Sequence, residues 1–134
     1  MSTLSVATIK SASSAAPVFQ NSSGTEIIQG AKAWVKWDGT GTLAINASFN
    51  VSSVTDQGTG YYKVNFATAF ADAHYTAHFQ GDSATIGGTG HMNPYIRSDS
   101  ESQMTTNYTS VAWHFGTNSA TRVDVACCSG VFHR

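Results

Sequence analysis

Hydrophobic and polar residues alternate through residues 31–51 of this chain. The segments 31–37 and 42–51 each carry an apolar side chain at every second position, and they flank the Gly-containing turn Asp38-Gly39-Thr40-Gly41. This arrangement is typical of a β-hairpin. Five apolar residues of the second segment share one parity: Leu43, Ile45, Ala47, Phe49 and Val51. We therefore expect one apolar and one solvated face on that strand, as in an antiparallel sandwich or small barrel.

Short alternating segments continue to the end of the chain. The expected strands are 61–66, 74–80, 95–97, 122–128 and 131–132, and 104–108 with 111–115 form either one bent strand or a pair. We interpret 54–56 as a connector, 67–72 as a corner and 81–94 as a long Gly-rich loop. No apolar stripe of helical period exceeds two turns. Strands at this spacing fit a sandwich, so we expect an all-β, antiparallel, jelly-roll-like domain over residues 29–134.

The three tryptophans are Trp34, Trp37 and Trp113. Trp37 shares the parity of Ala33 and Val35, which predicts a core position. Trp34 shares the parity of the neighbouring lysines, which predicts an exposed or interface position.

Residues 1–28 differ from the rest. Small residues fill 11–16 before Pro17, which is typical of an extended linker. Apolar side chains are spaced along the segment at Leu4, Val6, Ile9, Val18 and Phe19. We expect an N-terminal attachment arm whose apolar residues bury against neighbouring chains.

Composition narrows the function classes. Only 11% of the residues are charged, against about 25% in typical soluble chains, and about a quarter are Ser or Thr. This balance suits extracellular β-proteins and virion surface proteins. The net charge is −1 and the cations are scattered, so we expect no nucleic-acid partner. The N-terminus lacks a signal-peptide pattern, and no apolar stretch predicts a membrane span.

Candidate chemistry is sparse. Cys127 and Cys128 are adjacent, and strand neighbours point to opposite faces, so we expect two free thiols with at least one buried. His74 and His78 would lie about 13 Å apart on one strand, too far for one metal ion. Most carboxylates fall in predicted turns, and no Gly-x-Ser-x-Gly segment supports a nucleophilic serine. We expect no catalytic residue, no metal and no cofactor.

Several segments resemble a known group of phage proteins. They are TLSV at 3–6, APVFQNSSGTE at 16–26, AKAWVKWDGTG at 31–41, ASFNVSSVTDQGTG at 47–60 and YKVNF at 62–66. Together they resemble small virion proteins of cyanophages and other aquatic tailed phages, described as tail-fibre or tail proteins. The resemblance covers roughly residues 1–80 and is specific over 31–66.

The resemblance implies a virion surface protein, a homotrimer in which an arm attaches to other virion proteins (tail or major capsid protein) and a sandwich forms the tip. We expect a short tail-fibre module that binds a receptor, with a host surface glycan as one candidate partner. The alternative is a capsid decoration (cement) protein. The short length favours this alternative, because a chain of 134 residues has no room for a long fibre shaft. A small glycan hydrolase is a third, less favoured interpretation.

A receptor-binding tip predicts where contact occurs. Loops at one end of a sandwich present binding groups without disturbing the core. The expected contact segments are 81–94, 98–102 and 116–120. The candidate receptor or interface residues are Trp34, His91, Asn93 and Tyr95.

Overall fold

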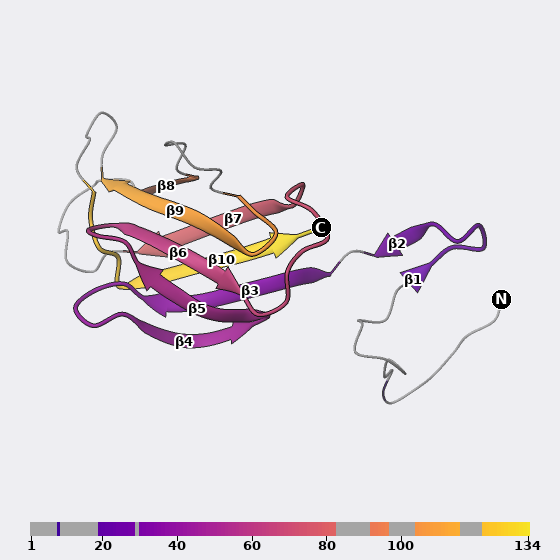
Figure 1. The fold of residues 1–134 in the computed structure, drawn as a ribbon, viewed down its shortest axis with the longest axis horizontal. Helices are drawn as coiled ribbons and strands as arrows, with labels where there is room; N and C mark the ends of the chain where they lie inside the picture. Colours follow the sequence, from indigo (N-terminus) through magenta and orange to yellow (C-terminus); the bar gives the residue numbers. More distant parts are fainter. Residues whose placement is uncertain (1–7, 9–18, 29, 83–91, 97–103, 116–121) are drawn as a thin grey trace. The chain divides into compact units, whose positions relative to one another are not determined.

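The computed structural model describes residues 8, 19–28, 30–82, 92–96, 104–115 and 122–134. Contacts within the chain form two compact units, Met1–Gly30 and Ala31–Arg134. The described residues contain strands and no helix (Figure 1). No helix long and apolar enough to cross a membrane is present among them.

The first unit contains a small hairpin that the sequence pattern did not predict. Strand β1 (Phe19–Gln20) pairs antiparallel with β2 (Glu26–Ile28). The Asn21 Oδ1 atom accepts hydrogen bonds from the backbone N–H groups of Ser23 and Thr25, at 3.0 and 2.9 Å. An Asn side chain that binds the backbone in this way holds a turn in place.

The second unit is a sandwich of two four-stranded antiparallel sheets (Figure 1). One sheet has the order β4-β3-β10-β7 and the other has the order β5-β6-β9-β8. The strands are β3 (Ala31–Asp38), β4 (Ala44–Phe49), β5 (Val51–Asp56), β6 (Tyr61–Phe66), β7 (Thr76–Asp82), β8 (Met92–Ile96), β9 (Tyr108–Phe115) and β10 (Cys127–His133). The expected all-β sandwich is confirmed.

The core lies between the sheets and is rich in aromatic residues. Trp37, Tyr62 and Trp113 are fully buried. The ring centroids of Phe66 in β6 and Phe132 in β10 are 5.0 Å apart with their planes at 81°, so this edge-to-face pair joins the two sheets. Such pairs contribute about 0.5–1.5 kcal/mol beyond the area they bury. The predicted core position of Trp37 and the buried alternation of 61–66 are confirmed.

Asn50 forms the corner at which the chain crosses from β4 to β5. Its φ is 53°, a left-handed conformation that Asn tolerates better than most residues. The Asn50 Nδ2 group donates to the carbonyls of Lys32 and Thr68 at 3.1 and 3.2 Å, and its Oδ1 accepts the Thr68 N–H at 2.7 Å. One side chain therefore connects the start of β3, the crossover and the loop after β6.

The expected single apolar face of residues 43–51 is wrong, and a β-bulge explains why. Trp37 pairs with Ile45 and Lys36 pairs with Ala47, so Asn46 has no opposite residue. An extra residue in one strand breaks the two-residue alternation. Ile45 consequently faces the side of Trp37, whereas Ala47 and Phe49 face the opposite side, and all of β4 is exposed.

Other boundaries also differ from expectation. Residues 54–56 belong to a full strand, β5. Met104 forms an isolated bridge with Thr109, and Tyr108 is already the first residue of the single strand β9. Residues 127–133 form one strand, β10, in place of the expected strands 122–128 and 131–132. Residues 123–126 do not belong to it. Of the expected 81–94 loop, residues 81–82 belong to β7 and residues 92–94 belong to β8, and 83–91 lie outside the described residues.

Candidate interaction surface

Four side chains form a row across the outer face of the β4-β3-β10-β7 sheet. In this sheet Phe49 pairs with Trp34, Trp34 with Val131, and Val131 with His78. Paired residues in an antiparallel sheet point to the same face. The row therefore crosses all four strands on the side away from the core.

The two aromatic residues of this row are exposed to solvent. Phe49 is 53% exposed and Trp34 is 38% exposed. Val131 is half-buried and His78 is exposed. The predicted exposure of Trp34 is confirmed, and the alternation with fully buried Trp37 in the same strand is its cause. Exposed apolar groups gathered on one face mark interaction sites more often than scattered ones do.

A second row lies beside the first and is mostly polar. It consists of Ala47, Lys36, Ser129 and Gln80 in successive strands. The Ser129 hydroxyl donates to the Gln80 backbone carbonyl at 3.3 Å, and Gln80 is exposed. Lys36 is exposed and has no carboxylate partner within the described ranges. We call these two rows together the aromatic sheet face.

The outer face of the β5-β6-β9-β8 sheet is different. The Asn65 Nδ2 group donates to the Ser53 and Thr55 hydroxyls, both at 3.0 Å. The Lys63 Nζ atom lies 4.4 Å from the centre of the Tyr108 ring, a cation–π contact. On this polar sheet face, Asn65 and Lys63 interact with neighbours of the same face, whereas the buried Ser110 hydroxyl opposite Lys63 has no hydrogen-bond partner. No large apolar residue of the face is exposed among the described residues.

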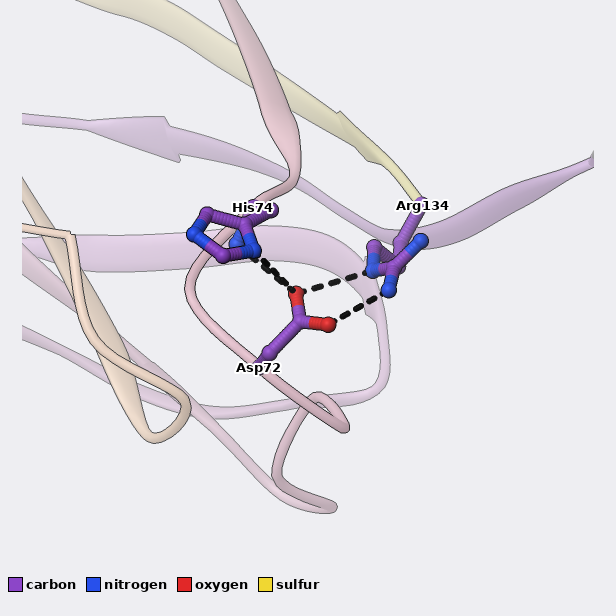
Figure 2. Close-up of polar contacts among 3 residues, drawn as sticks. All are labelled: Asp72, His74 and Arg134. Carbon is purple, nitrogen blue, oxygen red and sulfur yellow. Dashed lines mark hydrogen bonds and ion pairs between the residues drawn. The ribbon is translucent and has the colours of Figure 1, made fainter.

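A charged cluster joins the loop after β6 to the end of β10 (Figure 2). The Asp72 carboxylate accepts bonds from Arg134 Nε at 2.9 Å and Arg134 Nη2 at 2.5 Å, and from the His74 backbone N–H at 2.8 Å. The Arg134 hydrogen bonds, followed by the His74 amide, lower the pKa of Asp72. A carboxylate held ionised in this way is a weak base, so we interpret the cluster as a structural clamp.

A buried polar group lies at the other end of the core. The Tyr62 hydroxyl is 3.0 Å from both the Gly39 carbonyl and Asp124 Oδ1, and Asp124 also accepts the Gly60 N–H at 2.7 Å. Burial, followed by the hydrogen bond to Asp124, raises the pKa of Tyr62. A Cβ at position 39 would collide with the Tyr62 hydroxyl, so this contact requires glycine. Tyr62 therefore stays a neutral structural donor.

The two thiols behave as expected. Both are free, with Cys127 exposed and Cys128 fully buried. The Cys128 thiol donates to the Val125 carbonyl at 3.3 Å. Burial raises the pKa of Cys128 to about 12, which makes it a poor nucleophile. Within the described part of the chain, no three His, Cys, Asp or Glu side chains could together hold a metal ion.

The structure brings few of the sequence-predicted site residues together. Phe19 is 44% exposed in β1. Asn93 and Tyr95 belong to β8, in the opposite sheet from Trp34, and Tyr95 is half-buried. The remaining predicted residues lie outside the described ones: Leu4, Val6, Ile9, Val18 and His91. The expected contact segments 98–102 and 116–120, with 83–91 of the long loop, also lie outside them.

Sequence reasoning missed Phe49, Val131 and His78 as neighbours of Trp34. Phe49 looked like a core residue because the bulge at Asn46 leaves no clear mark in the sequence. Val131 and His78 reach Trp34 only through the pairing of β10 between β3 and β7. Comparison with protein-family models, curated proteins and solved structures finds no match to this chain.

Proposed function

We propose that this chain is a non-enzymatic surface protein of a tailed-phage virion, assembled as a homotrimer, and that it serves as a short tail-fibre tip that contacts the host. The trimer and the virion location rest on the sequence resemblance described above. The contact role rests on the aromatic sheet face.

The observation that carries the contact role is the exposed pair Phe49 and Trp34. Fully burying one such side chain contributes about 1.5–3 kcal/mol, and Phe49 and Trp34 are still 53% and 38% exposed within the chain. On the core side of the same sheet, Trp37 is fully buried and its ring centroid lies 5.8 Å from that of Tyr62. A rigid sheet with exposed aromatic rings is suited to binding a partner.

The arm, residues 1–28, has a separate role in this proposal. Its apolar residues Leu4, Val6, Ile9, Val18 and Phe19 bury against neighbouring virion proteins and hold the tip on the particle. The unit Ala31–Arg134 has its own core and its own internal contacts. The chain with residues 1–28 removed should therefore fold but fail to join virions.

Immunogold electron microscopy of virions from the encoding phage tests the location. An antibody against the purified chain should label the tail. Label on the head would replace the fibre role with capsid decoration, and unlabelled virions that also lack the chain by mass spectrometry would refute the proposal. Incorporation of the arm-deleted chain at the normal level would refute the role of the arm alone.

A further inference from the structure

We propose that His78 and His133 together bind one divalent ion of a late transition metal, such as Ni²⁺, Cu²⁺ or Zn²⁺, on the outer face of the β4-β3-β10-β7 sheet. Imidazole nitrogen is a preferred ligand of these ions. This inference goes beyond the proposed function and is independent of the virion role.

The histidine pair is created by the pairing of β7 with β10 (Figure 1). His78 lies opposite Val131, and His133 lies two residues farther along β10, opposite Thr76. Residues two apart in a strand point to the same face, so the two imidazoles are diagonal neighbours on the outer face. Spacing along one strand separates His78 from His74, whereas pairing between strands brings His133 beside it.

The two rings are close to the separation that a shared ion requires. Their centroids lie 6.4 Å apart and their planes meet at 74°. Imidazole nitrogen binds Zn²⁺ at about 2.0–2.1 Å, so two rings on one ion have centroids roughly 5–6 Å apart. His78 is exposed, and a small rotation about its side-chain torsions closes the remaining distance without movement of the strands.

Both imidazoles have nitrogen atoms available for a metal. Neither ring forms a hydrogen bond or an ion pair with another residue in the described part of the chain. A neutral imidazole keeps one nitrogen lone pair free. His74 differs, because its Nδ1 atom lies 3.7 Å from Asp72 Oδ1. Metal binding by His78 and His133 therefore breaks no polar interaction.

The surroundings of the pair select the class of ion. Lys32 is left without an opposite residue where β3 shifts its register against β10, next to Ala31 opposite His133. Arg134 follows His133 and binds Asp72. No group of three His, Cys, Asp or Glu side chains within the described ranges forms a metal site. Hard ions such as Mg²⁺ and Ca²⁺ need several oxygen ligands, so we expect only nitrogen-seeking ions to bind, with water in the other coordination positions.

Isothermal titration calorimetry of the full chain with NiCl₂ tests this site. The protein must lack a histidine tag, and Cys127→Ser serves as the parent of every variant, because the exposed Cys127 thiol is another ligand for such ions. The parent should bind one Ni²⁺ ion per chain. MgCl₂ and CaCl₂ should produce no binding.

Single substitutions locate the ion. His78→Gln and His133→Gln should each weaken Ni²⁺ binding by at least about tenfold, since loss of a residue that merely supports a ligand already costs about 10–100-fold. His74→Gln, at an exposed histidine outside the pair, is the matched control and should leave the affinity unchanged. Thermal melting without metal checks that each variant is folded, and the exposed position of His78 keeps the test valid if His133→Gln unfolds.

Electron paramagnetic resonance with Cu²⁺ counts the nitrogen ligands. The parent should show two coordinated nitrogens, and His78→Gln should show one. Absence of Ni²⁺ binding by the parent, unchanged affinity in His78→Gln, or an equal loss in His74→Gln would each overturn the inference and leave the two rings as a simple aromatic contact.

The result is separable from the proposed function. A chain that is present on virions but binds no Ni²⁺ refutes the metal site and leaves the virion role. A chain that binds Ni²⁺ through the pair but is absent from virions refutes the virion role and leaves the metal site.

Discussion

The two outer faces of the sandwich differ in how their side chains interact with one another. On the polar sheet face, Asn65 bonds to Ser53 and Thr55, and Lys63 lies over Tyr108. On the aromatic sheet face, Phe49, Trp34 and Lys36 remain exposed. Both faces belong to antiparallel four-stranded sheets around one core, so strand geometry cannot account for the difference.

The difference lies in whether each face uses up its own binding capacity. Amide and hydroxyl groups that bond to one another gain little from an outside partner, because binding would first have to break those bonds. Exposed rings keep their capacity for a partner, as does the Lys36 ammonium group, which forms no ion pair with the described residues. We therefore expect substitutions on the polar sheet face to alter stability and substitutions on the aromatic sheet face to alter binding.

The largest effect should come from the corner that joins the two sheets. Asn50→Ala removes the bonds to Lys32 and Thr68 and places alanine at a φ of 53°. We expect the free energy of unfolding to fall by about 2–3 kcal/mol, measured by urea denaturation. Asn50→Gly relieves the backbone strain but not the lost bonds, so its loss should be smaller. Equal losses would show that the left-handed conformation costs nothing.

An intermediate effect should separate the faces directly. Asn65→Ala removes two hydrogen bonds from the polar sheet face and should lower the free energy of unfolding by about 1 kcal/mol. Phe49→Thr keeps strand propensity at an exposed site and should change it by less than about 0.5 kcal/mol. The same denaturation measurements check both. A larger loss for Phe49→Thr would mean that Phe49 serves stability.

The sequence predicted what depends on short-range alternation. The hairpin of β3 and β4, the buried face of β6 and the opposite exposures of Trp34 and Trp37 all follow from a two-residue period. The bulge at Asn46 was not predictable, because it arises where β4 adjusts its register to β3. The aromatic row was not predictable either, since Val131 and His78 join it through long-range pairing of β10.

The smallest effect should come from the charged clamp, which belongs to neither face. Arg134 lowers the pKa of Asp72 in the folded chain, so its stabilising contribution is present above the pKa of a free carboxyl group, about 3.9. That contribution is lost as the pH falls through the lowered folded pKa. Asp72→Asn should therefore be slightly less stable than the original chain at neutral pH and equally stable in strong acid.

Thermal melting of both proteins from about pH 7 to pH 2 measures this difference. Asp99→Asn, outside the described residues, is a charge-matched control. A difference between the Asp72 variant and the original chain that persists unchanged into strong acid would contradict a role for the ionised carboxylate.

Competition for host adsorption tests the central claim most directly. Purified chain should block phage adsorption to host cells, Lys63→Gln and Asn65→Ala should block it equally well, and Phe49→Thr should lose most of the blocking at the same concentration. If Phe49→Thr blocks as well as the original chain while a change on the polar sheet face abolishes blocking, the aromatic sheet face is not the contact surface.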